Sequence, residues 1–244
     1  MDTKLDQLLA LARDGTRSGL PEEEKANVVL DQARTLIRSG RHLAARSLIE
    51  EVRRTLPADA SPALRARVAL NLGACHMYAG DTATAEAEFH AALRSQPDDP
   101  KPLINLAVAR LVSGDGAGAL ERSRRARELA PDDADAAAVY LEVLHATGQD
   151  VMLETTLQEH ASLRTSAHVL APLGLIRQDQ GRHAEAEDLY REAERLDPRT
   201  RACRPIGPAR SWPKSSRRWK QTRRHSRGAW TRACESGCSR PNSS

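Results

Sequence analysis

The sequence of 244 residues is long enough for one domain or two small ones, and its content is 40% hydrophobic and only 3% aromatic. No apolar run exceeds a few residues, so the sequence predicts neither a signal peptide nor a membrane span, and the expected location is cytoplasmic. The net charge of +4 hides two opposite parts: residues 201–244 hold twelve Lys and Arg against one acidic residue, a charge of +11, which leaves −7 for residues 1–200.

The first predicted element is a helix within residues 1–25. Leu5, Leu8, Leu9 and Ala12 recur there at helical spacing. Such an apolar stripe covers the end of a stack of repeats, so we expect residues 1–25 to form an N-terminal capping helix.

A period of 33 to 34 residues governs the chain after residue 25. Glycines recur at spacings of 34, 34 and 33, each between two short apolar helical patterns: Gly80, Gly114, Gly148 and Gly181. The glycine ends a first helix, and a proline near the end of most units blocks continuation of the second. Such a period is typical of stacked helix pairs. The predicted units are about 26–59, 66–99, 100–133, 134–166 and 167–200.

Small residues recur with the same period, as required where two helix backbones approach closely. The recurring positions are Gly73 and Ala107, then Ala85, Ala119 and Ala186, then Ala92, Ala126 and Ala193. The fourth unit is the weakest copy, because Leu153 and His160 stand where alanines are expected and no proline closes it. Six extra residues, Ala60 to Arg65, join the first two units, and Pro172 falls early in its predicted helix, where a first-turn proline is tolerated.

These columns resemble the tetratricopeptide repeat family over about residues 26–200. The aromatic that this family places before the closing alanine is Phe89 in one unit and Tyr190 in another, with Ser123 between them. The resemblance implies an all-α, right-handed superhelical solenoid of about five helix-turn-helix pairs. The core of this solenoid would be a continuous strip rather than a globule. The composition of residues 201–244 predicts a disordered C-terminal tail after it.

The resemblance also implies which side chains meet a partner, because the first helix of each pair lines the concave groove in this family. The side chains expected to contact a partner are Arg34, Arg38, Arg67, Asn71, Tyr78, Lys101 and Asn105. Asn71 and Asn105 share one unit position, at which asparagines in family members hold a peptide backbone; the alternative is that both are consensus residues with solvated side chains. The prediction is a scaffold that binds an extended peptide or partner segment in the groove.

The family's carboxylate clamp, which grips a C-terminal acidic peptide, is only partly matched. Asn71 and Lys101 stand at clamp positions, but Leu30, Arg34 and Asn105 replace the Lys, the Asn and the basic residue expected at the others. The sequence has no Gly-rich phosphate loop, HExxH motif or nucleophile elbow, so we expect no enzyme within residues 1–200, and no cofactor or metal. Cys75, the only cysteine before residue 200, argues against a disulfide framework there.

Residues 201–244 break the pattern. They contain no Leu, Val, Met, Phe or Tyr, so they cannot bury enough apolar surface to offset the entropy of ordering. Yet they hold all three tryptophans and three of the four cysteines. A zinc site of Cys234, Cys238 and His225 lacks the fourth ligand that a closed site needs.

Three interpretations of this tail stay open. Its Arg and Trp residues could bind nucleic acid through phosphate contacts and base stacking. Alternatively, the reading frame changes near Pro198 or Arg199, or the tail is a plain disordered linker. A second hypothesis for the whole chain, which the resemblance suggests, is that it is the N-terminal targeting region of a longer enzyme of glycosyltransferase or sulfotransferase type, truncated by a frame change. The expected partner is a protein or peptide rather than nucleic acid or a membrane.

Overall fold

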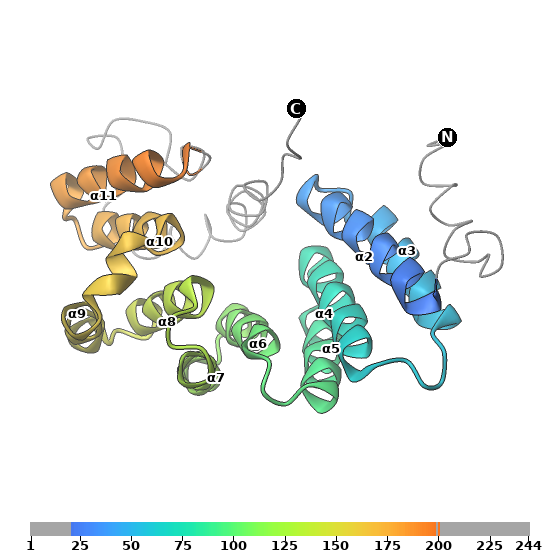
Figure 1. Cartoon of the computed structure of the whole chain (residues 1–244). Coiled ribbons are helices and arrows are strands. Elements are labelled where there is room, and N and C mark those ends of the chain that lie inside the picture. Colours follow the sequence, from blue (N-terminus) through green and yellow to red (C-terminus); the bar gives the residue numbers. More distant parts are fainter. Residues whose placement is uncertain (1–20, 199, 201–244) are drawn as a thin grey trace. The chain divides into compact units, whose positions relative to one another are not determined.

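The computed structural model describes residues 21–198 and residue 200 (Figure 1). They form ten α-helices and one 3₁₀ helix, with no strand in this part of the chain. The predicted all-α class is confirmed. Residues 1–20 of the predicted capping helix and the whole tail, 201–244, lie outside the described residues.

The helices divide into two compact units, the first ending at Asp115 and the second beginning at Gly116. The helices of the first unit are α2 (Glu22–Arg38), α3 (His42–Thr55), α4 (Pro62–Ala79), α5 (Thr82–Ser95) and α6 (Pro100–Ser113). The second unit holds α7 (Gly116–Leu129), α8 (Ala134–Ala146), α9 (Asp150–Glu159), the 3₁₀ helix η1 (Ala161–Thr165), α10 (Ala167–Asp179) and α11 (His183–Leu196). The single array over residues 26–200 and its five unit boundaries stay predictions.

The first unit packs consecutive helices around a core of aliphatic side chains. Leu30 of α2, Leu48 and Ile49 of α3, and Leu72 of α4 are fully buried in one cluster. A second cluster joins Phe89 of α5 to side chains of α6. The apolar stripe of each helix is therefore covered by its neighbours in the chain.

The second unit has a core of its own, supplied mainly by α8 and α10. Leu141, Leu144, Leu153 and Val169 are fully buried in one cluster. The fourth predicted repeat, the weakest in sequence, differs from the others in its second helix: α9 has only 10 residues and is followed by the 3₁₀ helix η1. The loss of the expected alanines and proline therefore coincides with a shortened helix.

The repeat glycines end the first helix of each pair, as predicted. The five of them, Gly40, Gly80, Gly114, Gly148 and Gly181, have φ angles between +74° and +86°. This is the left-handed region, which a side chain disfavours and which closes a helix by turning the chain away. The period seen in the sequence is thus a period of backbone conformation.

Close packing within helix pairs explains two further columns of the repeat. A Cβ atom built on Gly73 would overlap the ring of Phe89, and one on Gly174 would lie 2.7 Å from Cε1 of Tyr190. Because it has no side chain, each glycine leaves the space that is occupied by the aromatic ring on the second helix of its own pair. In both pairs the glycine and the aromatic residue form one packing unit.

Most of the extra residues Ala60 to Arg65 lie in the first turn of α4, because α4 begins at Pro62 and the Oγ of Ser61 caps it by accepting a hydrogen bond from the Leu64 N–H at 3.3 Å. The expectation for Pro172 was wrong. Pro172 lies inside α10 rather than in its first turn, since that helix begins at Ala167. The earlier start places the proline where it removes one intrahelical hydrogen bond without ending the helix.

Candidate functional site

The residues predicted to contact a partner all lie in the first compact unit, on the first helix of each pair. Arg34 and Arg38 lie on α2, Arg67, Asn71 and Tyr78 on α4, and Lys101 and Asn105 on α6. The helix α4 packs against both α2 and α6, so these three helices adjoin in that order. Asn71 follows Arg67 by four residues and Asn105 follows Lys101 by four, which puts each pair on one face of its helix. We call the surface carrying these residues the predicted binding face.

Arg67 ties α4 to α2 on this face. Its Nη1 donates to Oδ1 of Asn27 at 2.7 Å, and its Nη2 donates to the carboxylate of Asp31. The guanidinium is only partly exposed, and the ion pair offsets its charge. Arg67 is therefore positioned by its own protein and is a weaker candidate for a partner contact than an unengaged arginine would be.

The two asparagines share the predicted binding face with exposed basic side chains. Asn71 and Asn105 are half-buried, whereas Arg34 and Lys101 are exposed. The apolar residues that alternate with them on the helix face, Leu70 and Ile104 among them, are half-buried as well, which gives the predicted binding face an apolar floor. Chemically, this surface combines amide groups, positive charge and accessible hydrocarbon.

Tyr78 takes part in packing between helix pairs. Its ring stacks on the imidazole of His42 in α3, with ring centroids 4.0 Å apart and planes 9° from parallel. It also packs against the buried cluster of the first unit. One face of the tyrosine is thus covered by the protein itself, so the structure gives this residue an internal role that the sequence did not indicate.

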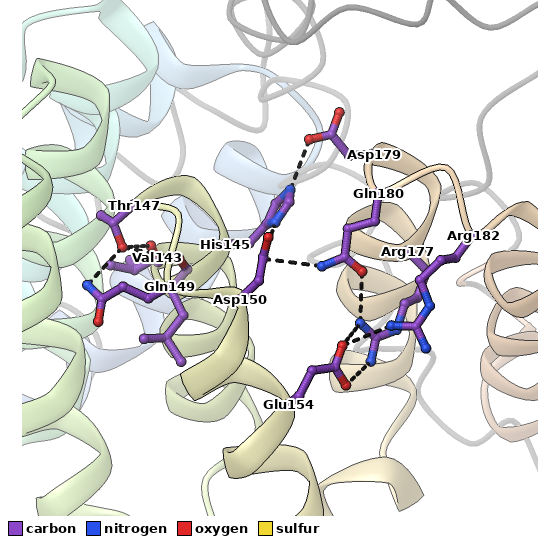
Figure 2. Close-up of polar contacts among 11 residues, drawn as sticks. Val143, His145, Thr147, Gln149, Asp150, Glu154, Arg177, Asp179, Gln180 and Arg182 are labelled. Atoms are coloured by element: carbon purple, nitrogen blue, oxygen red, sulfur yellow. Dashed lines mark hydrogen bonds and ion pairs between the residues drawn. The ribbon is translucent and has the colours of Figure 1, made fainter.

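The second compact unit contains a polar cluster that we did not predict (Figure 2). His145, near the C-terminal end of α8, reaches two carboxylates: its Nδ1 lies 2.8 Å from Oδ1 of Asp150, and its Nε2 lies 2.9 Å from Oδ2 of Asp179. The hydrogen bond to Asp179 contributes most to raising the pKa of His145 above its ordinary value; burial opposes the shift, and Asp150 adds to it. The imidazole therefore connects α8 with α9 and α10.

An arginine pair continues this cluster. Arg177 of α10, a buried side chain, donates from Nη1 and Nη2 to the two carboxylate oxygens of Glu154 on α9, and Arg182 donates to Glu154 Oε1 at 2.9 Å. Burial raises the pKa of the Glu154 carboxyl, but the hydrogen bonds and charges of the two arginines lower it by more than burial raises it. The pKa of Glu154 therefore lies below its usual range. Gln180 links the two parts by donating to Asp150 at 3.2 Å and accepting from Arg177 at 2.9 Å.

The repeat period itself carries a signal for this cluster. His145 and Asp179 are 34 residues apart, one period, and so occupy nearly equivalent positions on neighbouring first helices. Scanning the sequence for opposite charges one period apart would have found them. The cluster is not a metal centre: within the residues that the structure describes, no group of three or more His, Cys, Asp or Glu could hold a metal ion.

Two family models match the sequence, both described as tetratricopeptide repeat: one over residues 76–141 and one over residues 167–200. The chain carries tetratricopeptide repeats in both stretches. No protein of curated function matches its sequence.

A solved structure of another tetratricopeptide repeat protein has a similar fold. A thermophilic member from Thermus thermophilus is 20% identical, covers 71% of this chain and 92% of its own, and superposes with a TM-score of 0.61. Weaker likenesses are MamA, 16% identical over 75% of this chain and 98% of its own with a TM-score of 0.48, and YrrB, whose structure is described as having an unusual peptide-binding site, 16% identical over 80% and 94% with a TM-score of 0.45.

The tetratricopeptide repeat fold is typical of protein-interaction scaffolds, which are generally not catalytic. Neither the matched families nor the structures support the two alternative hypotheses, a truncated enzyme and a nucleic-acid-binding tail, and the tail lies outside the described residues. Among the helices of the described part, none is long and apolar enough to cross a bilayer.

Proposed function

We propose that this protein is a non-catalytic cytoplasmic scaffold that holds an extended peptide or partner segment on the predicted binding face of α2, α4 and α6. The observation that supports this most is the placement of Asn71 and Asn105 at equivalent positions of two adjoining helices, both half-buried, on a face that also carries the exposed Arg34 and Lys101. The partner is a protein segment, as in other scaffolds of this fold.

A peptide in extended conformation has backbone N–H and C=O groups that point sideways and need partners. A primary amide has both donors and acceptors, so one asparagine can serve both groups of a single peptide unit. Equivalent asparagines on successive first helices would meet successive parts of the same extended chain. Recognition of this kind depends on backbone more than on sequence.

The charge of the predicted binding face determines which partner segments it favours. Arg34 and Lys101 are exposed and Arg38 is half-buried, while Asp31, the carboxylate among them, is paired with Arg67. The face therefore has an excess of positive charge, which favours a segment carrying Asp or Glu. Such exposed charges add to the association rate and to specificity more than to affinity.

The proposal is tested on the full chain with synthetic decapeptides. One set alternates Glu with apolar residues, a second has Lys in place of Glu, and a third repeats the first with N-methylated backbone. We expect fluorescence anisotropy to show binding of the first set and weaker binding of the other two. The double variant Asn71→Ala, Asn105→Ala should lose about thirtyfold or more in affinity, since each asparagine contributes at least one hydrogen bond of about 1 kcal/mol.

Two charge reversals supply a matched control. Lys101→Glu should weaken binding of the acidic set, whereas Arg94→Glu, at an exposed position on α5 outside the predicted binding face, should not. Both should melt like the parent, as judged by circular dichroism. Equal affinity of the parent and the Asn71, Asn105 double variant for the acidic set would remove the assignment of this face.

A further inference from the structure

The position of His145 implies a definite protonation state. Asp150 and Asp179 place carboxylate oxygens within 2.9 Å of its two ring nitrogens, one from α9 and one from α10 (Figure 2). A neutral imidazole has one N–H, so it can donate to only one carboxylate and must turn a lone pair towards the other. The imidazolium donates to both. The observed geometry therefore fits the charged ring.

The surroundings of His145 let its ring proton exchange with solvent while the two hydrogen bonds to Asp150 and Asp179 stay largely shielded from water. The side chain of His145 is 11% exposed, whereas those of Asp150 and Asp179 are 48% and 29% exposed. The carboxylates are thus in contact with water and the ring is largely shielded. Hydrogen bonds to a shielded cation are stronger than those of an exposed pair.

The charges that act on the ring come from two of the helices around it, Asp150 on α9 and Asp179 on α10. The helix α7 also packs against α8, but its Arg127 lies over the ring of Tyr140, with the guanidinium carbon 5.4 Å from the centroid. The remaining charged groups of the cluster on α9 and α10 pair with each other. Removing the proton of His145 therefore leaves two carboxylates facing a neutral ring.

We propose that His145 is a proton-operated latch, which strengthens the attachment of α10 to α8 and α9 while it is charged and weakens it when it is neutral. Loss of the proton breaks one of the two hydrogen bonds and turns a ring nitrogen lone pair towards a carboxylate. The bonds between Gln180 and Asp150 and between Arg177 and Glu154 still join α9 to α10, but they do not involve α8. Because the latch lies in the second compact unit, it does not depend on the proposed peptide-binding function.

The direction of the pH effect follows from linkage. The pKa of His145 is higher in the folded protein than the ordinary value of about 6.5, chiefly because of the hydrogen bond to Asp179. Its contribution to stability is therefore fully present below that ordinary value and is lost as the pH rises through the higher pKa of the folded state. The latch is closed below about pH 6.5 and opens as the pH rises through the raised pKa of His145 in the folded protein.

The test measures the ring and the helices separately, on the full chain. Nitrogen-15 NMR should show both ring nitrogens of His145 protonated at pH 6, and a titration midpoint above about 6.5. Hydrogen exchange of amides in α9 and α10, corrected for the intrinsic pH dependence of exchange, should then speed up across that midpoint, by about tenfold for each unit of pKa elevation.

Variants separate the latch from ordinary packing. In His145→Gln, which cannot be charged, the change in corrected exchange of α9 and α10 at the His145 midpoint should disappear, and Asp179→Asn should lower that midpoint. His76→Gln is the matched control, because His76 in the first unit meets a single carboxylate, Asp81, at 3.4 Å. A parent ring that titrates at or below its ordinary value, or that is a neutral tautomer at pH 6, would overturn the proposal even if no variant folds.

Discussion

Arg177 and Glu154 form a two-pronged ion pair between α10 and α9, and the same repeat positions are joined in the first compact unit by Arg110 and Glu86. Both terminal nitrogens of Arg177 donate to Glu154, and Nη2 of Arg110 lies 2.8 Å from Oε2 of Glu86. In each case the arginine comes from a first helix and the glutamate from the second helix of the preceding pair. An opposite-charge pair at a fixed repeat position favours this register of a first helix on the second helix of the preceding pair, because the two charges meet only in that register.

Removing the carboxylate of Glu154 should destabilise the second unit. The change Glu154→Gln leaves the buried guanidinium of Arg177 with a neutral partner, at a cost of about 2 kcal/mol. Urea unfolding followed by circular dichroism measures the difference. Arg195→Gln, which removes an exposed pair with Glu192, is the control and should leave the unfolding curve unchanged. Equal curves for both variants would show that the buried pair adds nothing to stability.

A methyl group on Gly73 should disturb the packing of α4 on α5. The new Cβ would meet Phe89 well inside van der Waals contact, so Gly73→Ala should destabilise the protein by about 1–3 kcal/mol. A smaller side chain in place of the ring, as in Phe89→Ser, should relieve the clash, because the third unit carries Ala107 and Ser123 at these positions. Thermal melting of the two single variants and the double variant tests whether their effects are coupled. Additive effects would contradict direct packing of the Phe89 ring against Gly73.

Replacing a repeat glycine should strain the backbone without creating a clash. Gly80 has a φ of +80° and nothing within 4 Å of where its Cβ would lie. Gly80→Ala should therefore cost about 1–2 kcal/mol through conformation alone. Gly80→Asn should cost less, since asparagine tolerates left-handed φ better. Melting temperatures of the two variants decide this, and an alanine variant as stable as the asparagine variant would argue against the strain.

The thiol of Cys75 should be inert in the folded protein. Burial raises its pKa to about 12, so almost none of it is thiolate near neutral pH, and the thiolate is the reactive form. Iodoacetamide in mildly alkaline buffer should leave Cys75 unmodified in the native chain and alkylate it in denaturant, as peptide mass spectrometry can measure. Rapid labelling of native protein at this residue would mean that α4 opens locally.

Local features of the chain could be predicted because they depend on residues close in sequence. A glycine at a fixed period specifies the left-handed turn that ends a helix, and Gly73 with Phe89 lie on consecutive helices of one pair. The start of α4 was missed because Ser61 and Pro62 form an N-terminal cap that the repeat pattern does not contain. The division into two compact units was also not predicted, since each repeat looks alike in sequence.

The candidate sites show more clearly which contacts the sequence could not predict. Family resemblance placed Asn71 and Asn105 on first helices, but it did not indicate that Arg67 is held by Asp31, 36 residues earlier, or that Tyr78 stacks on His42. Contacts of this kind depend on how far one helix is shifted and rotated against the next. A pattern within a single helix does not record that shift.

Composition and period therefore sufficed for the helix pairs, their glycine turns and the family, because hydrophobic spacing and backbone conformation are local properties of the chain. Only the packing of neighbouring helices decided which polar side chains meet. His145 becomes a bridge between two carboxylates because Asp150 and Asp179 are brought to opposite ends of its ring from separate helices. The charge of such a residue is a property of its neighbours in space.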